Sequence, residues 1–170
     1  MEIHLRPLEE RDAPLMLEWQ KEPSIMCFFR FDASRATVES CRAYIEAARR
    51  ETDSRHYAIA DENDEYLGTI SLKHIDPVRK DAEYAISTRK CAHGTGAALA
   101  ATRRLLTIAF GELGLERVYL NVLTENGRAN AFYRKAGFVF DRTEPSAVEI
   151  RGERKDLNWY TIRKDQNTEI

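Results

Sequence analysis

The chain has 170 residues, a formal net charge of −2 and 43% hydrophobic residues. This length fits one globular domain with its own core, so we predict a single domain over residues 1–170. The balanced charge gives no strong field for a nucleic acid or an anionic membrane surface, and no apolar run approaches the roughly 18 residues of a membrane helix. We expect neither as a partner.

The three cysteines, Cys27, Cys41 and Cys91, match neither a zinc motif nor a disulfide framework. Unpaired thiols are typical of a reducing compartment, and the first residues lack the apolar core of a secretory signal. We therefore predict a cytoplasmic protein that is a monomer or a homodimer, and we assign no metal ligand.

One strand and two helices are predicted in the first 50 residues. Glu2 to Leu8 has its apolar side chains on one face, as a strand does, and Asp12, with a proline two positions later, is typical of a helix start. A second helix is predicted over Thr37–Arg50. Thr37 suits its N-cap, but Ser40 replaces the usual glutamate, so we expect an incomplete capping box.

An aromatic cluster, Cys27-Phe28-Phe29-Arg30-Phe31, falls in a predicted loop between these two helices. Such a loop can cover a core or line a substrate pocket. The sequence leaves both interpretations open.

The middle of the chain predicts a β-meander. Three strands are expected at His56–Ala60, Tyr66–His74 and Ala82–Ser87, separated by polar turns. The connections are short, so we expect the strands to pair antiparallel.

The second half predicts alternating helices and strands, which makes the chain a mixed α/β protein. Gly137 is placed to end the second of these helices in a left-handed conformation. The expected elements are a helix over Gly94–Leu113, a strand over Arg117–Leu123, a helix over Asn126–Lys135, and closing strands at Phe138–Phe140 and Leu157–Ile162.

A glycine-containing turn joins the Ala82–Ser87 strand to the helix that follows it. Gly94 and Gly96 lie in this turn. Backbone N–H groups at a helix N-terminus favour a phosphate, and glycine lets a ligand approach the backbone closely. Many helices begin after a glycine for structural reasons alone, so this signal is weak by itself.

A second strand, turn and helix run from Asn121 to Phe138. Asn126 is placed to cap the helix, and Tyr133 lies two turns further along it. Taken alone, this segment is also explained by structural roles and does not indicate a function.

Together the two segments resemble the GCN5-related N-acetyltransferase (GNAT) superfamily. The first is similar to its pyrophosphate loop, Gln/Arg-x-x-Gly-x-Gly/Ala, with Cys91, Gly94 and Gly96 at the fixed positions. Cys91 departs from the usual Gln or Arg, so nearby Arg89 or Lys90 is expected to supply the positive charge. The second is similar to Asn-x-x-Ala-x-x-Phe-Tyr-x-Lys-x-Gly-Phe, matched by Asn126, Ala129, Phe132, Tyr133, Lys135, Gly137 and Phe138.

Different segments of the chain are similar to two branches of that superfamily, which acetylate different acceptors. Leu5-Arg6-Pro7-Leu8 is similar to enzymes that acetylate ribosomal-protein N-termini. Leu67–Leu72 and Ala82–Ile86 are similar to enzymes that acetylate nucleotide sugars and surface-polysaccharide precursors.

The resemblance implies a mixed, centrally splayed β-sheet flanked by helices, the acyl-CoA N-acyltransferase fold. Acetyl-CoA is implied as co-substrate, wedged between the parted strands Ala82–Ser87 and Arg117–Leu123. The coenzyme-binding residues implied are Tyr84, Ala85, Ile86, Ser87, Cys91, Ala92, His93, Gly94, Thr95, Gly96, Ala97, Asn121 and Asn126.

Direct transfer to an amine needs a base and an acid. An amine is mostly protonated at neutral pH, and we expect Glu83 to take its proton, directly or through water. The alternative is that Glu83 is an ordinary solvent-facing strand residue, with His74 and His93 as lesser candidates for the base. The resemblance assigns protonation of the departing thiolate to Tyr133. No covalent enzyme intermediate is needed, so Cys91 is not assigned as a nucleophile.

The sequence predicts an acetyl-CoA-dependent N-acetyltransferase whose acceptor is a small-molecule or peptide amine. We rank an amino sugar or another small amine first. The alternatives are a protein N-terminus as acceptor, a non-catalytic acetyl-CoA sensor, and a structural module without a ligand.

Overall fold

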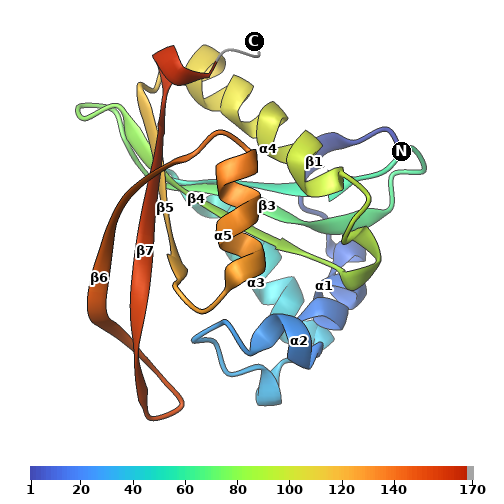
Figure 1. Cartoon of the computed structure of the whole chain (residues 1–170). Helices are drawn as coiled ribbons and strands as arrows, with labels where there is room; N and C mark the ends of the chain where they lie inside the picture. Colours follow the sequence, from blue (N-terminus) through green and yellow to red (C-terminus); the bar gives the residue numbers. More distant parts are fainter. Residues whose placement is uncertain (168–170) are drawn as a thin grey trace.

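The computed structural model describes residues 1–167, so the last three residues of the predicted domain lie outside it (Figure 1). Within this range seven strands form one sheet in the order β1-β2-β3-β4-β5-β7-β6. The strands are β1 (His4–Pro7), β2 (Arg55–Ala60), β3 (Tyr66–Asp76), β4 (Asp81–Thr88), β5 (Arg117–Leu123), β6 (Val139–Ile150) and β7 (Glu153–Arg163). The helices are α1 (Ala13–Gln20), α2 (Pro23–Met26), α3 (Val38–Arg50), α4 (Ala97–Thr107) and α5 (Gly127–Lys135).

Helices cover both faces of the sheet. On one face, Leu105 of α4 packs in a buried cluster with Leu72 and Tyr84 of the central strands. On the other face, Met16 of α1 and Ile45 of α3 belong to a second buried cluster. No helix in residues 1–167 has the length and apolar character needed to cross a membrane.

The sheet parts at its centre. Strands β4 and β5 are parallel, but they pair only from Asp81 to Glu83 against Arg117 to Tyr119. Beyond this point β5 continues alongside β7, while β4 continues alongside β3, so a gap opens between them (Figure 1). This confirms the predicted mixed, centrally splayed sheet flanked by helices.

The start of α3 corrects one expectation. The Thr37 hydroxyl accepts a hydrogen bond from the Ser40 backbone at 3.1 Å, and the Thr37 backbone donates to the Ser40 hydroxyl at 2.9 Å. The capping box is therefore complete, because a serine oxygen accepts the bond as a carboxylate would. The one-turn helix α2 was not predicted, since four residues are too few to show a helical period.

Helix α4 begins three residues later than predicted. Gly94 and Gly96 have φ values of +77° and +84°, a left-handed conformation that cannot continue an α-helix. A 3₁₀ turn over Lys90–Ala92 precedes them, and the far end of the helix continues as a π-helical turn over Ile108–Glu112.

Strands β6 and β7 are much longer than the closing strands predicted. Strand β6 lies at the edge of the sheet, and most of its residues are exposed. Its pairing with β7 shifts register after Phe140 and again after Glu144. An exposed, twice-interrupted strand shows no alternation of apolar and polar residues, so its sequence resembles a loop.

Gly68 on β3 lies opposite Thr88 on β4, and this contact supports a stability prediction. A Cβ at Gly68 would lie 2.4 Å from the Ser87 carbonyl oxygen and 2.9 Å from Thr88 Cα. We expect Gly68→Ala to lower the free energy of unfolding by about 1–3 kcal/mol, because backbone must move to admit the methyl group. Urea denaturation measures the change.

Gly127→Ala is the matched control. A Cβ there meets nothing within 4 Å at the first turn of α5. Equal stability of the two variants would contradict the close approach of β3 to β4.

Candidate active site

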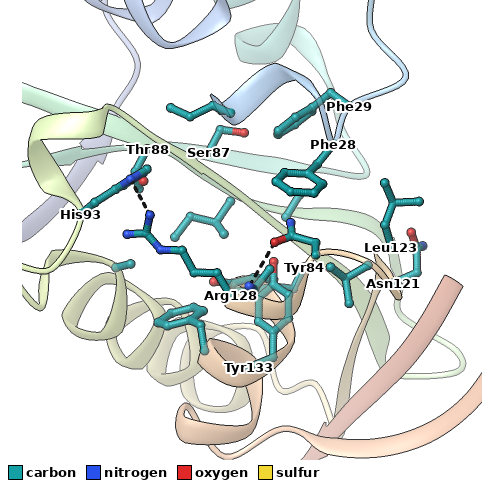
Figure 2. Close-up of a pocket in the computed structure, with 18 of the residues that line it drawn as sticks. Phe28, Phe29, Tyr84, Ser87, Thr88, His93, Asn121, Leu123, Arg128 and Tyr133 are labelled. Carbon is teal, nitrogen blue, oxygen red and sulfur yellow. Dashed lines mark hydrogen bonds between the residues drawn. The ribbon is translucent and has the colours of Figure 1, made fainter. Parts of the chain in front are cut away.

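A pocket of about 560 Å³ lies where β4 and β5 part (Figure 2). Strand β4, the turn before α4, helix α5 and the loop after α2 form its walls. Of the predicted site residues it includes Glu83, Tyr84, Ala85, Ile86, Ser87, Ala92, His93, Gly94, Gly96, Asn121, Asn126 and Tyr133, and it does not include Cys91, Thr95 or Ala97.

The turn before α4 has the geometry of an anion cradle. The Thr95 hydroxyl donates to the Ala92 carbonyl at 2.6 Å and accepts from the Ala97 backbone at 3.2 Å, which fixes the turn. A Cβ at Gly94 or Gly96 would meet no protein atom within 4 Å, so both face open space. Backbone N–H groups at the start of an eleven-residue helix favour a phosphate there. These residues therefore fit a pyrophosphate.

A charge at Gly94 tests this cradle. We expect Gly94→Asp to raise the KM for acetyl-CoA roughly 10- to 100-fold, because like charges about 4 Å apart repel by ~1 to 4 kcal/mol. Gly94→Asn is the matched control, since asparagine has the same shape, tolerates positive φ and carries no charge. Equal KM values for the two variants, measured by initial rates, would place the pyrophosphate elsewhere.

Arg89 does not supply the charge that Cys91 lacks. Its Nε donates to Glu18 at 2.6 Å, and its Nη1 donates to Glu65 at 2.7 Å. These bonds raise the pKa of Arg89 and lower the pKa of Glu18. Arg89 therefore ties β4 to α1 and to the turn before β3, and the expectation that it faces the coenzyme is wrong. Lys90 lies 3.9 Å from Glu22 and does not line the pocket.

Arg128 brings a guanidinium to the turn before α4. It lies in the first turn of α5, lines the pocket and donates to His93 Nδ1 at 3.0 Å (Figure 2). Burial and the charge of Arg128 lower the pKa of His93, so the ring accepts this bond in its neutral form. Sequence reasoning missed Arg128 because it occupies a variable position of the second motif.

Tyr133 presents its hydroxyl to the pocket. Its ring packs edge-on against Tyr84, with the centroids 5.8 Å apart. The structure gives its hydroxyl no hydrogen-bond partner among residues 1–167, and burial raises the pKa of Tyr133 to about 12. The hydroxyl of Tyr84, by contrast, is bonded to Thr102 at 2.8 Å and serves the core. Tyr133 is therefore a protonated donor available to a ligand at neutral pH.

Glu83 is the last residue of β4 that pairs with β5, so its carboxylate lies where the gap begins. Oε1 accepts a hydrogen bond from Asn121 Nδ2 at 3.2 Å. Oε2 lies 3.6 Å from Lys73 Nζ and 3.7 Å from His74 Nε2. Lys73 is paired directly opposite Glu83 in the β3–β4 register, and His74, with a φ of +51°, lies in the irregularity of β3 that follows. The carboxylate accepts one hydrogen bond, lies at ion-pair distance from Lys73, and still lines the pocket.

The two predicted asparagines bond to the protein itself. Asn121 orients Glu83, and Asn126 Oδ1 caps α5 by accepting from the Ala129 backbone at 3.2 Å. Asn130, which the motif leaves variable, fixes the same helix. Its Nδ2 donates to the Leu123 carbonyl at 3.0 Å, and its Oδ1 accepts from the Tyr160 hydroxyl at 2.8 Å. Together these bonds set the distance between α5 and the sheet.

The aromatic loop serves both purposes considered for it. Phe29 packs against Trp19 at a centroid distance of 6.0 Å and also lines the pocket, as Phe28 does (Figure 2). Arg30 lines the pocket as well, whereas Phe31 is half exposed.

A parallel strand pair that parts over a pocket, followed by an anion-binding turn, defines a coenzyme A-dependent acyltransferase. Residues 2–139 match the family described as acetyltransferase (GNAT) domain. The chain belongs to the GNAT acetyltransferase family, as the sequence indicated. It is an N-acetyltransferase with acetyl-CoA as its co-substrate.

Relatives cover the chain to different extents. It is 33% identical over 97 residues to a Bacillus subtilis protein named as a ribosomal N-acetyltransferase, YdaF, a match that covers 57% of this chain and 53% of that protein. It is 29% identical over 136 residues to spermidine N(1)-acetyltransferase of Escherichia coli, which covers 80% of this chain and 72% of that protein.

Solved structures share the whole fold. A crystal structure of spermidine N-acetyltransferase from Vibrio cholerae, in complex with CoA and spermine, superposes with a TM-score of 0.87. It covers 97% of each chain at 22% sequence identity, a likeness that concerns the fold.

Proposed function

We propose that residues 1–170 form a single acetyltransferase domain that moves the acetyl group of acetyl-CoA directly to a small primary amine. One observation carries this proposal. Glu83, which can take a proton, and Tyr133, which can give one, line the same pocket at the point where the strands part.

The base is Glu83 in this proposal. A primary amine with a pKa near 8 to 10 is mostly protonated at neutral pH and cannot attack until it loses a proton. Asn121 donates a hydrogen bond to one carboxylate oxygen, and Lys73 Nζ lies 3.6 Å from the other. His74 is largely exposed beside the same carboxylate and connects it to solvent.

The acid is Tyr133 in this proposal. Acetyl-CoA supplies the thioester, and its thiolate needs a proton as it leaves. The raised pKa of Tyr133 keeps the phenol protonated at neutral pH, and its hydroxyl faces the pocket without a partner among the described residues. The strand edge at Tyr84–Ser87 and the turn at Gly94–Gly96 would hold the coenzyme, with Arg128 as an added contact.

Three acceptors compete. An amino sugar was ranked first from the sequence, and a protein N-terminus was its rival. A polyamine becomes a candidate because a relative that matches 80% of the chain is named as a spermidine acetyltransferase. We propose a small amine over a protein N-terminus because Phe28 and Phe29 line the pocket, where their rings can stack on a small acceptor.

A two-step experiment tests the proposal. A thermal shift with acetyl-CoA reports binding, and thiol release with spermidine, an amino-sugar nucleotide and N-terminal peptides reports transfer. We expect a shift and turnover with a small amine. A shift without turnover would identify a sensor, no shift would identify an empty module, and faster turnover of peptides would make a protein N-terminus the acceptor.

We also propose a reducing compartment, the cytoplasm, for this reaction. The thiols of Cys27, Cys41 and Cys91 are all unpaired, which supports this placement.

A further inference from the structure

We propose that the acceptor carries a phosphate or a carboxylate in addition to its amine, and that Arg30 and Lys73 bind this anionic group. The inference rests on the proposed acetyl transfer and names the substrate class of the same pocket. The proposed acceptor differs from spermidine, which carries only positive charges and gives some relatives of this chain their name.

The charges of the pocket carry the first step. Among the described residues that line it, Glu83 is the only carboxylate. Four side chains with a permanent positive charge line it as well. They are Arg30, Lys73, Arg128 and Lys135.

These cations lie in different parts of the pocket. Arg128 contacts His93 beside the pyrophosphate turn, so it serves the coenzyme. Lys73 lies 3.6 Å from Glu83, where the amine must lose its proton. Lys73 therefore lies at the acceptor end of the pocket, beside Glu83.

Arg30 is a free guanidinium at this pocket. The structure gives it no hydrogen bond or ion pair within residues 1–167, although it lines the cavity beside Phe28 and Phe29. Neighbouring arginines are already engaged: Arg89 binds two carboxylates, and Arg151 donates to the Met26 carbonyl at 3.2 Å. An unpaired guanidinium beside aromatic walls is suited to bind a phosphate or carboxylate with two hydrogen bonds.

Lys73 supplies the second cation. Lys73 lies directly opposite Glu83 in the β3–β4 register, and 38% of its side chain is exposed. It can therefore contact Glu83 and a bound anion together. A polyamine would meet Lys73 and Arg30 with its extra ammonium groups, and the single carboxylate Glu83 is already shared with Lys73 and Asn121. Such like-charge contacts disfavour a partner strongly.

Matched amines test the proposal. Glucosamine and glucosamine 6-phosphate differ by one phosphate, and butylamine and 4-aminobutyrate differ by one carboxylate. We expect the anionic member of at least one pair to have a kcat/KM roughly 10- to 100-fold higher, as charged hydrogen bonds allow, and spermidine to be slower than that member. Both pairs report which anion is bound.

Charge reversal at Arg30 assigns the contact. Arg30→Glu should remove most of the preference for the anionic member, lower its kcat/KM far more than that of the member without the anionic group, and raise kcat/KM for spermidine. Arg35→Glu is the matched control, because Arg35 is exposed nearby and lines no part of the pocket. It should leave every ratio unchanged.

The outcomes separate the two proposals. Spermidine as the fastest acceptor, or an anion preference that survives Arg30→Glu, would overturn this inference while acetyl transfer stands. Failure of every amine to react, with acetyl-CoA bound, would overturn the proposed function itself. Loss of the anion preference in Arg30→Glu, with the preference kept in Arg35→Glu, supports the assignment.

Discussion

Tyr133→Phe is expected to lower kcat by roughly 10²- to 10⁴-fold, the range for removal of one general acid. Phenylalanine keeps the ring that packs against Tyr84 and Tyr160, so the fold should survive. The KM for acetyl-CoA should change little, because the hydroxyl acts mainly when charge develops on sulfur. Single-turnover rates, which isolate the chemical step, measure the effect.

Tyr84→Phe is the control for this substitution. It removes the hydroxyl bonded to Thr102, a contact of the core, and should reduce stability by about 1 kcal/mol without a comparable loss of kcat. The raised pKa of Tyr133, about 12, adds a second expectation. The phenol stays protonated below that pH, so Tyr133 should cause no fall in rate up to about pH 10. Normal turnover in Tyr133→Phe, with chemistry limiting, would mean that solvent protonates the thiolate.

Glu83→Gln is expected to lower kcat by roughly 10²-fold or more, because an amide cannot take the amine proton. Glutamine has the same shape, and its carbonyl oxygen can still accept the bond from Asn121. Initial rates on both enzymes measure this change.

Glu116→Gln is the matched control, since Glu116 is exposed, pairs with Lys80 and lies outside the pocket. It should retain the activity of the parent enzyme. If Glu83→Gln does the same, the base is another group or bulk water.

Sequence predicted the elements whose local signals are strong. Strand β5 begins and ends at Arg117 and Leu123 as predicted, because alternating burial leaves a clear pattern. Helix α5 ends where Gly137 takes a left-handed φ of +99°, and Asn126 caps its start. Each of these features depends on side chains within a few residues of the element.

Features that depend on distant contacts were not predictable. The β6 strand is stabilised by pairing with β7 rather than by its own pattern. Arg89 is removed from the coenzyme by Glu18 and Glu65, which lie 71 and 24 residues away in the sequence. His74 comes near Glu83 at an irregularity in β3 that its local sequence does not indicate.

The candidate site divides in the same way. The glycine turn and Tyr133 belong to contiguous motifs, so sequence could propose them. Arg30 and Arg128 carry no motif signal, because their proximity to the pocket is set by packing of the α2 loop and of α5 on the sheet. Charge at the acceptor end is therefore a property of the folded chain.

The pairing of β4 with β5 ends at Glu83, and this has a consequence for the stability of the protein in the cell. Within residues 1–167 no strand pairs with this edge of β4 beyond that residue, so a ligand can add there as a strand-like partner. A ligand that binds only the folded form stabilises it by RT ln(1 + [L]/Kd), about 2.7 kcal/mol at one hundred times Kd. Resistance to unfolding and proteolysis would then rise and fall with the supply of acetyl-CoA, so the abundance of the enzyme would follow the metabolic state of its host.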